Sequence, residues 1–248
     1  MSFKRITAAT LISMAILSGC ATTATTTATE PEHQVKIAQA DERVLGYFSA
    51  DGEFGQEKSG NGYLRKYLGK TAEGKSVLQD FYTNSGKPQT SPFVLFDDAG
   101  LEDWNSLQYT EGDIVFYNAD GTVSARATLK EGQYVGSNTQ YHGNGKVFLK
   151  EQYNPDSEIT ATSYFDEAGK PLFAFTIDST GDDYKIDVKV YDEAGTAYPA
   201  TEAHDDKIQA ATANIAALMN KRSALEAKLA GQEAPEEQAI ILPTMPEE

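Results

Sequence analysis

The sequence predicts a mainly β fold: a repetitive meander of antiparallel hairpins over residues 35–200, followed by one C-terminal α-helix. Three observations lead to this prediction. An aromatic residue followed four positions later by glycine recurs along the chain, and the intervening segments alternate apolar and polar residues. After residue 203 the apolar residues change abruptly to the 3-4 spacing of a helix.

The aromatic–glycine unit is the first of these observations. Asn, Asp and Ser are common between the two residues, where they favour turns, and glycine accepts the positive φ that closes a hairpin. Each copy therefore predicts a strand, a tight turn and a strand. The copies are Phe48 and Gly52, Tyr82 and Gly86, Phe96 and Gly100, Tyr117 and Gly121, Tyr141 and Gly145, Phe165 and Gly169, and Tyr191 and Gly195.

The spacing of the copies indicates a repeat array. From Phe96 onward they fall 21, 24, 24 and 26 residues apart, whereas Tyr82 lies outside this register and is expected to mark the opposite turn of a hairpin. The repeated aromatics are expected to pack across neighbouring hairpins, with a ligand-stacking face as the alternative. Weaker turn signals lie at Glu111-Gly112, Glu131-Gly132, Asn154-Pro155-Asp156 and Thr180-Gly181-Asp182.

Alternation along the strands is the second observation. Apolar residues at every second position, which place apolar side chains on one side of a strand, are typical of antiparallel strands that bury one face. The alternating apolar residues are Val123, Ala125, Ala127 and Leu129 in one segment, Ile159 and Ala161 in a second, and Ile186, Val188 and Val190 in a third.

The third observation, the helical segment, covers residues 203–230. Asp205 and Asp206 suit the positive N-terminal end of a helix dipole, and Gly231 is a natural stop. We expect this amphipathic helix either to cover the sheet or to self-associate. Residues 231–248 are expected to be a disordered acidic tail, with one apolar cluster at Ile240-Ile241-Leu242. The apolar stripe of the helix comprises Ile208, Ala211, Ile215, Leu218, Leu225 and Leu229, with Arg222 on the same side.

Residues 1–19 predict a lipoprotein signal peptide. Lys4-Arg5 precedes a short apolar stretch, and Leu17-Ser18-Gly19-Cys20 resembles the lipobox of bacterial lipoprotein precursors. In that family the peptide is cut before the cysteine, which is then acylated with chains such as palmitate. The resemblance implies lipidation of Cys20 and an outer-membrane lipoprotein, since Ala21 replaces an aspartate typical of inner-membrane retention. The alternative is an ordinary signal peptide with an incidental cysteine.

Residues 20–34 predict a Thr/Ala-rich tether between this anchor and the repeat domain, because residues 21–34 include no aromatic or large apolar residue. Formal net charge is −16, and removal of Lys4 and Arg5 with the leader takes it to −18. Such a field repels nucleic acid and anionic lipid head groups, so a protein or another envelope component is the expected partner.

A family resemblance covers residues 47–196. Phe81-Tyr82-Thr83-Asn84-Ser85-Gly86-Lys87, Phe116-Tyr117-Asn118-Ala119-Asp120-Gly121, Tyr141-His142-Gly143-Asn144-Gly145-Lys146 and Tyr164-Phe165-Asp166-Glu167-Ala168-Gly169-Lys170 resemble the bacterial variant of the MORN repeat. Thr122 and Thr196 stand where that repeat usually has lysine. The resemblance implies an elongated sheet of hairpins in an exported or lipid-anchored protein, with a binding, scaffolding or antitoxin-like role.

Residues for catalysis and metal binding are not arranged in any pattern that the sequence reveals. His33, His142 and His204 lie far apart, without metal-ligand spacing, and His142 is expected to be solvated in a turn. Asn118-Ala119-Asp120-Gly121 is only a fragment of a calcium loop. We therefore expect no catalytic residue, no metal and no cofactor. Acid pairs do leave turn carboxylates as hydrolase candidates, at Asp97-Asp98, Asp166-Glu167, Asp182-Asp183 and Asp192-Glu193.

Three functions remain open from the sequence. The favoured expectation is a lipid-anchored, non-enzymatic binding or scaffolding module of the cell envelope. The alternatives are an assembly accessory that acts through the helix and tail, and an envelope hydrolase that uses turn carboxylates.

Overall fold

The computed structural model describes residues 34–58, 60–156, 158–178, 185–231 and residue 242. The chain divides into two units, residues 1–32 and 33–248, and the described residues belong to the second. Cys20, His33 and most of the predicted tether and tail therefore lie outside the described residues. No helix among the described residues is both long and apolar enough to cross a membrane.

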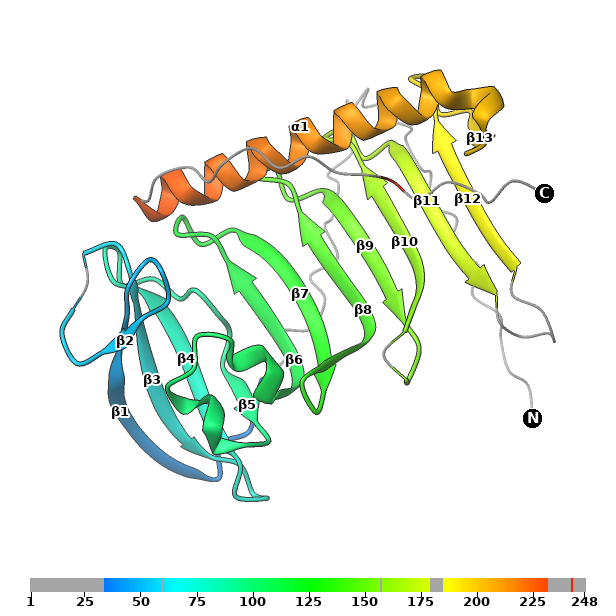
Figure 1. Cartoon of the computed structure of the whole chain (residues 1–248). Helices are drawn as coiled ribbons and strands as arrows, with labels where there is room; N and C mark the ends of the chain where they lie inside the picture. Colours follow the sequence, from blue (N-terminus) through cyan, green and yellow to red (C-terminus); the bar gives the residue numbers. More distant parts are fainter. Residues whose placement is uncertain (1–33, 59, 157, 179–184, 232–241, 243–248) are drawn as a thin grey trace, which may run out of the picture. The chain divides into compact units, whose positions relative to one another are not determined.

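Thirteen strands among the described residues form one antiparallel sheet (Figure 1). From β3 to β13 each strand pairs with its neighbours in the chain, which confirms the predicted hairpin meander; at the other end β1 lies between β3 and β2. The strands are β1 (Gln39–Phe48), β2 (Phe54–Gly55), β3 (Tyr63–Lys70), β4 (Ser76–Tyr82), β5 (Phe93–Leu95), β6 (Thr110–Tyr117), β7 (Val123–Lys130), β8 (Gln133–Tyr141), β9 (Val147–Tyr153), β10 (Ile159–Phe165), β11 (Pro171–Asp178), β12 (Lys185–Tyr191) and β13 (Ala197–Pro199).

The repeated turns share one hydrogen-bond pattern. In the turn at residues 118–122, the Asn118 N–H donates to the Thr122 carbonyl and the Gly121 N–H donates back to the Asn118 carbonyl. The same pair of bonds closes the turns at residues 49–53, 71–75, 142–146, 166–170 and 192–196. Their glycines have φ between +80° and +95°, which an L side chain rarely adopts. This conformation explains why glycine recurs.

The copy at Phe96 and Gly100 is not a hairpin turn, so that prediction was wrong. The chain there enters two short 3-10 helices, η1 (Asp98–Leu101) and η2 (Ser106–Tyr109), which connect β5 to β6. Gly100 is buried, and a Cβ on it would lie 2.8 Å from the Cβ of Tyr109. Close packing, and not a positive φ, requires glycine at this position.

Two further turn predictions need correction. The turn after Tyr82 lies at the same end of the sheet as the turn after Tyr117, because the Tyr82 Oη donates to the Tyr117 carbonyl at 2.8 Å. The segment after Phe96, and not the Tyr82 turn, therefore marks the opposite end. Gly112 lies within β6 instead of in a turn. The turns at Glu131-Gly132 and at residues 154–156 are present, and residues 180–182 lie outside the described residues.

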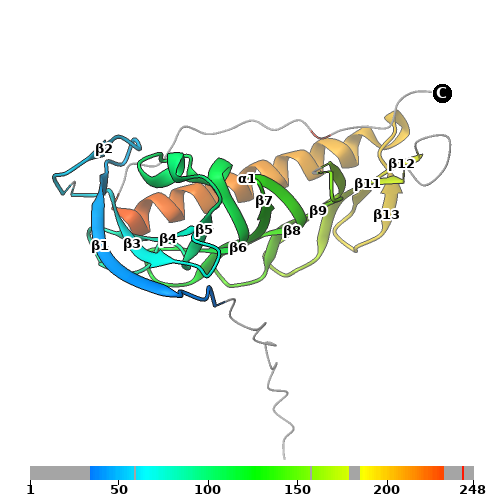
Figure 2. The ribbon, with the colours of Figure 1, turned by 90° about the horizontal axis from the view of Figure 1, so that it is seen from below.

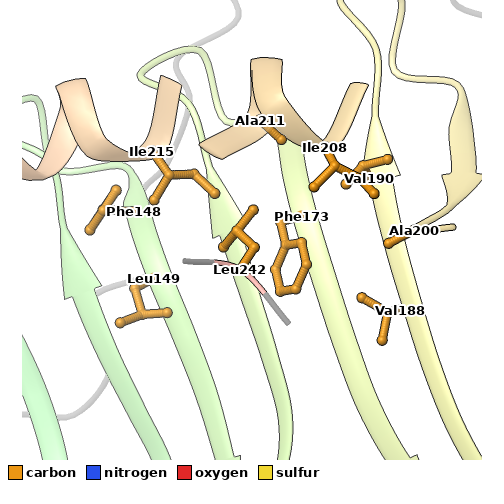
Figure 3. Close-up of a cluster of buried hydrophobic side chains, with 10 residues drawn as sticks. All are labelled: Phe148, Leu149, Phe173, Val188, Val190, Ala200, Ile208, Ala211, Ile215 and Leu242. Carbon is orange, nitrogen blue, oxygen red and sulfur yellow. The ribbon is translucent and has the colours of Figure 1, made fainter. Parts of the chain in front are cut away.

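The helix α1 (Asp205–Ala230) follows the short 3-10 helix η3 (Glu202–His204) and ends at Gly231, whose φ is +71°. It runs across the strands near one end of the sheet (Figure 1) and lies against one face (Figure 2). We call this end of the strands the helix end. Buried side chains of α1 share an apolar cluster with β9, β11 and β12 (Figure 3), which accords with the covering role. The cluster comprises Phe148, Leu149, Phe173, Val188, Val190, Ala200, Ile208, Ala211, Ile215 and Leu242.

A second apolar cluster lies on the same face beneath η1 and η2. Ala127 and Leu129 are buried in it, as the alternation predicted, together with residues of β3 to β6. The alternation overestimated the burial of the strand ends, because Ile159 and Ile186 remain 38% and 41% exposed. The two clusters are separate, one under the N-terminal half of α1 and one under the η1–η2 segment.

The contact stripe of α1 departs from the predicted one beyond Arg222. Leu225 is 36% exposed, whereas Ala227 and Ala230 are buried. Leu225 contacts the turn at Gly143, where a Cβ would lie 2.8 Å from the Leu225 Cδ2. The buried residues in the C-terminal half of the helix are thus alanines, which fill less volume than Ile208 and Ile215 in the N-terminal half.

Candidate binding groove

A cavity of about 490 Å³ lies between the C-terminal half of α1 and the helix end of β3, β4 and β6 to β8. We call it the helix groove. Its wall combines aromatic rings, side-chain amides, one acid and one guanidinium. The lining residues are Tyr63, Tyr82, Gln89, Phe116, Tyr117, Asn118, Ser124, Ala125, Gln140, Arg222, Ser223, Glu226, Ala227 and Ala230.

The pairing of β3 with β4 sets the aromatic side of the helix groove. Tyr63 and Tyr82 are directly opposite in the register, and their ring centroids lie 5.5 Å apart. Burial raises the pKa of Tyr82, and the nearby Tyr63 and Glu226 raise it further. The Tyr82 hydroxyl therefore stays protonated and donates to the Tyr117 carbonyl. Trp104, the single tryptophan of the chain, packs on Tyr63 with centroids 4.6 Å apart.

Arg222 supplies the main polar group of the opposite wall. Its Nη1 donates to the Gln140 Oε1, and its Nη2 lies 2.9 Å from the Glu226 Oε1 in an i, i+4 ion pair. Among the described residues, the Arg222 Nε is the buried side-chain nitrogen without a hydrogen-bond partner. An unpaired buried donor costs free energy, so this nitrogen marks a strained point where α1 meets the sheet. The sequence marked Arg222 only as an anomaly in an apolar stripe.

The helix groove coincides with a gap in a ladder of lysines along the helix end. The Lys87 Nζ donates to the Asp120 carbonyl of the next turn at 2.8 Å, and the Lys146 Nζ likewise reaches the Ala168 carbonyl at 2.8 Å. Lys170 continues the ladder to the Glu193 carbonyl at 3.1 Å. Thr122 is too short for such a bond. Arg222 from α1 lies at this position, with its Nη2 3.5 Å from the Ser124 carbonyl.

Polar contacts hold the C-terminal end of α1 beside the helix groove. The Asn84 Nδ2 donates to the Ala230 carbonyl at 2.7 Å, and the Asn61 Nδ2 donates to the Gly231 carbonyl. These bonds satisfy carbonyls that a helix terminus leaves unpaired. Farther along the helix, the Lys221 Nζ lies 2.7 Å from each carboxylate oxygen of Glu167.

Three of the carboxylates proposed for hydrolysis bond backbone N–H groups of their own segments, whereas Asp98 accepts from the Ser76 hydroxyl and Glu167 pairs with Lys221. The Asp166 Oδ1 accepts from the Ala168 and Lys170 N–H groups, both at 2.8 Å. The Asp192 Oδ1 accepts in the same way, and the N–H of Thr196 holds the pKa of Asp192 below its ordinary value. Asp97 caps η1 by accepting from the Ala99 N–H. Asp182 and Asp183 lie outside the described residues.

The structure does not assemble the calcium-loop fragment into a metal site. The Asp120 Oδ1 accepts from both the N–H and the hydroxyl of Thr122, and those bonds lower the pKa of Asp120. The Asn118 Nδ2 also donates to the Thr122 hydroxyl. No cluster of three or more His, Cys, Asp or Glu residues in the described part of the chain could hold a metal ion.

His142 differs from its prediction as a solvated turn histidine. It is only 4% exposed, with its Nε2 2.9 Å from the Phe165 carbonyl and its ring against Phe148. It thus joins two neighbouring turns, a contact that its own turn sequence does not indicate. His204 packs on Tyr198 near the start of α1. It lies 62 residues after His142 in the sequence. Lipidation of Cys20 remains a prediction, since that residue is outside the described range.

The sequence reveals the aromatic repeats but not the helix groove. Tyr82 and Tyr117 belong to the repeated units, and the ligand-stacking alternative pointed to them. Gln89 and Gln140 carry no local motif, because only the position of α1 brings them to the same cavity.

Comparison with known proteins leaves the family open. No family model matches the chain, and no curated protein matches it. Among solved structures, the crystal structure of TarM is similar over 53% of this chain and 20% of that chain, with 15% identity and a TM-score of 0.21. A likeness this loose supports no argument about function.

Proposed function

We propose that this chain is a lipid-anchored protein of the bacterial cell envelope, in the outer membrane, and that it acts as a non-catalytic binding module through the helix groove. The lipobox-like residues ending in Cys20 motivate the anchor. The MORN-like units motivate a binding role, since such repeats present an extended sheet to partners.

The helix groove is the observation that carries the binding role. Its volume of about 490 Å³ lies within the usual range of small-ligand sites. Aromatic rings form one part of the wall and a few polar groups, such as Gln89 and Arg222, form the rest, as is typical of such sites. The carboxylates of Asp166 and Asp192 are engaged by backbone N–H groups, which supports binding over hydrolysis.

Retention on envelope material tests this function. The full-length protein, held in detergent micelles that cover its acyl chains, would be incubated with detergent-washed cell-envelope fragments that hold no bilayer, and its bound fraction compared with that of two variants. Tyr82→Ala removes a ring from the helix groove, whereas Tyr153→Ala removes a half-buried ring outside it. We expect the first variant to lose retention and the second to keep it. Equal retention of both variants, or turnover of an envelope component by the purified protein, would contradict the proposal.

A further inference from the structure

We propose that the helix groove binds a neutral saccharide, one or two sugar rings long, from an envelope glycan. This inference rests on the proposed function and adds the chemical class of the ligand. It follows from three properties of the wall: its aromatic faces, its amides and its balanced charge.

The aromatic faces suit the C–H face of a sugar ring. An aromatic ring carries negative charge density on its face, and the C–H bonds of a pyranose are polarised positive by the attached oxygens. Tyr63, Tyr82, Phe116 and Tyr117 all line the helix groove, and each is only partly buried by the protein. The Tyr63 ring also contacts Tyr82 and Trp104, so the partly exposed side chains of Tyr82, Phe116 and Tyr117 supply most of the aromatic surface for a ligand.

The amides suit hydroxyl groups. A sugar hydroxyl both donates and accepts hydrogen bonds, and a primary amide does the same through its NH₂ and carbonyl. Gln89, from the connection between β4 and β5, and Gln140, from β8, line the helix groove, and the Gln140 Oε1 already accepts from Arg222. Asn118 lines it from the turn after β6 but is only 6% exposed, with its Nδ2 bonded to Thr122.

The charge balance favours a neutral ligand. Arg222 and Glu226 pair with each other at 2.9 Å, and they are the only ionisable side chains of opposite charge that line the helix groove. An anionic ligand would break this pair and approach a chain of net charge −16, while a cation would meet the guanidinium. A neutral polyhydroxylated ligand leaves the pair intact.

Trp104 gives the test a built-in reporter, because it is the chain's single tryptophan and its ring packs against that of Tyr63. The detergent-solubilised full-length protein would be titrated with glucose, N-acetylglucosamine and their β-linked dimers at up to millimolar concentration. Emission of Trp104 and calorimetry would both be followed. N-acetyl-dialanine amide, a neutral peptide, serves as the competing ligand class.

We expect a saturable signal from at least one saccharide and none from the peptide. Tyr82→Ala and Gln89→Leu should each lower the association constant at least about tenfold, since each removes a stacking or hydrogen-bonding group. Tyr153→Ala and Gln152→Leu make the same changes outside the helix groove and should stay within about twofold. Gln89 has no side-chain bond in the fold that its substitution would break, so Gln89→Leu keeps the test valid if Tyr82→Ala fails to fold.

The saccharide assignment is overturned if no sugar gives a saturable signal, if the peptide binds instead, or if the groove variants bind like the controls. Failure here is distinguishable from failure of the proposed function. If envelope retention still depends on Tyr82 while none of the sugars binds, the proposed binding function is supported and only the saccharide assignment is rejected.

Discussion

Arg65 and Asp80 form a bidentate ion pair inside the protein, with Nε to Oδ1 at 2.8 Å and Nη2 to Oδ2 at 2.7 Å. Their side chains are 1% and 5% exposed. The Arg65 Nη1 also donates to the carbonyls of Gly100 and Asp103, and its Nη2 donates to the Ser106 hydroxyl. A single guanidinium therefore joins β3 and β4 to the η1–η2 segment that covers the second apolar cluster.

Removing that guanidinium should destabilise the protein strongly. Arg65→Met leaves the Asp80 carboxylate buried without its partner, which we expect to lower the free energy of unfolding by about 3–5 kcal/mol. Arg43→Met, which removes the exposed Arg43–Asp41 pair, should cost less than about 1 kcal/mol. Urea unfolding followed by Trp104 emission measures both. The double variant Arg65→Met/Asp80→Leu should regain most of the loss, and an Arg65→Met loss below that of Arg43→Met would contradict the structural role.

Alanine substitutions at two turn glycines should distinguish the cost of backbone strain from the cost of a steric clash. Gly121 has φ +95° with open space around a Cβ, whereas Gly132 has φ +77° and a Cβ there would lie 2.2 Å from the Gln108 carbonyl oxygen. Gly121→Ala should cost about 1 kcal/mol for φ alone, or roughly 2–4 °C in Tm. Gly132→Ala should shift Tm at least twice as far, because η2 must also move. Calorimetry of both variants checks this order, and equal shifts would argue against the contact with η2.

Acid should weaken the helix end through groups whose pKa is lowered on folding. Hydrogen bonds from Thr196 lower the pKa of Asp192, and the Lys221 ammonium lowers the pKa of Glu167. Since folding lowers these pKa values, the stabilisation is present above the unfolded-state values and is lost as pH falls through the folded-state ones. Tm should therefore be steady above about pH 5 and fall below about pH 4.

Asp192→Asn separates this titration from loss of the turn bonds. The asparagine Oδ1 can still accept from the Ala194 and Thr196 N–H groups but does not ionise. The variant should show a shallower loss of Tm between about pH 4 and pH 2 than the wild type. Superimposable pH profiles would show that Asp192 does not contribute.

The anchor is tested at the cysteine itself. Cys20→Ala should abolish incorporation of a radiolabelled fatty acid and release the protein from the outer-membrane fraction, because acyl chains supply the membrane affinity. Pulse labelling followed by membrane fractionation measures both effects. Ser18→Ala, a substitution two residues before the cysteine that keeps a small residue, is the matched control. Label that persists in Cys20→Ala would rule out acylation at this residue.

The sequence predicted those parts of the fold that local chemistry determines. Asp166 and Asp192 bond the N–H groups of their own turns, and Gly169 and Gly195 supply the positive φ, so each turn is specified within five residues. The hairpin prediction for the copy at Phe96 was wrong because Gly100 is required by close packing and not by a positive φ. It makes room for Tyr109, which becomes its neighbour only after η1 and η2 fold.

Features that depend on distant contacts could not be predicted in this way. Arg65 lies 15 residues from Asp80 and 35 from Gly100, and nothing in its own segment marks it as buried. The helix groove depends on where α1 lies on the sheet, which is set partly by Asn84 contacting Ala230 across 146 residues. The same placement leaves Leu225 partly exposed and buries Ala227, contrary to the predicted stripe.

Hydrogen–deuterium exchange of the lipidated full-length protein, with and without washed envelope fragments, tests the helix groove as the binding site most directly. The account predicts slower exchange in residues 219–231 of the α1 end and in the segments 82–90 and 116–125 that line the groove. Exchange at the opposite end of the sheet, in residues 130–134 and 152–156, should not change. Slower exchange confined to that opposite end, or no change in the α1 segment, would contradict the account.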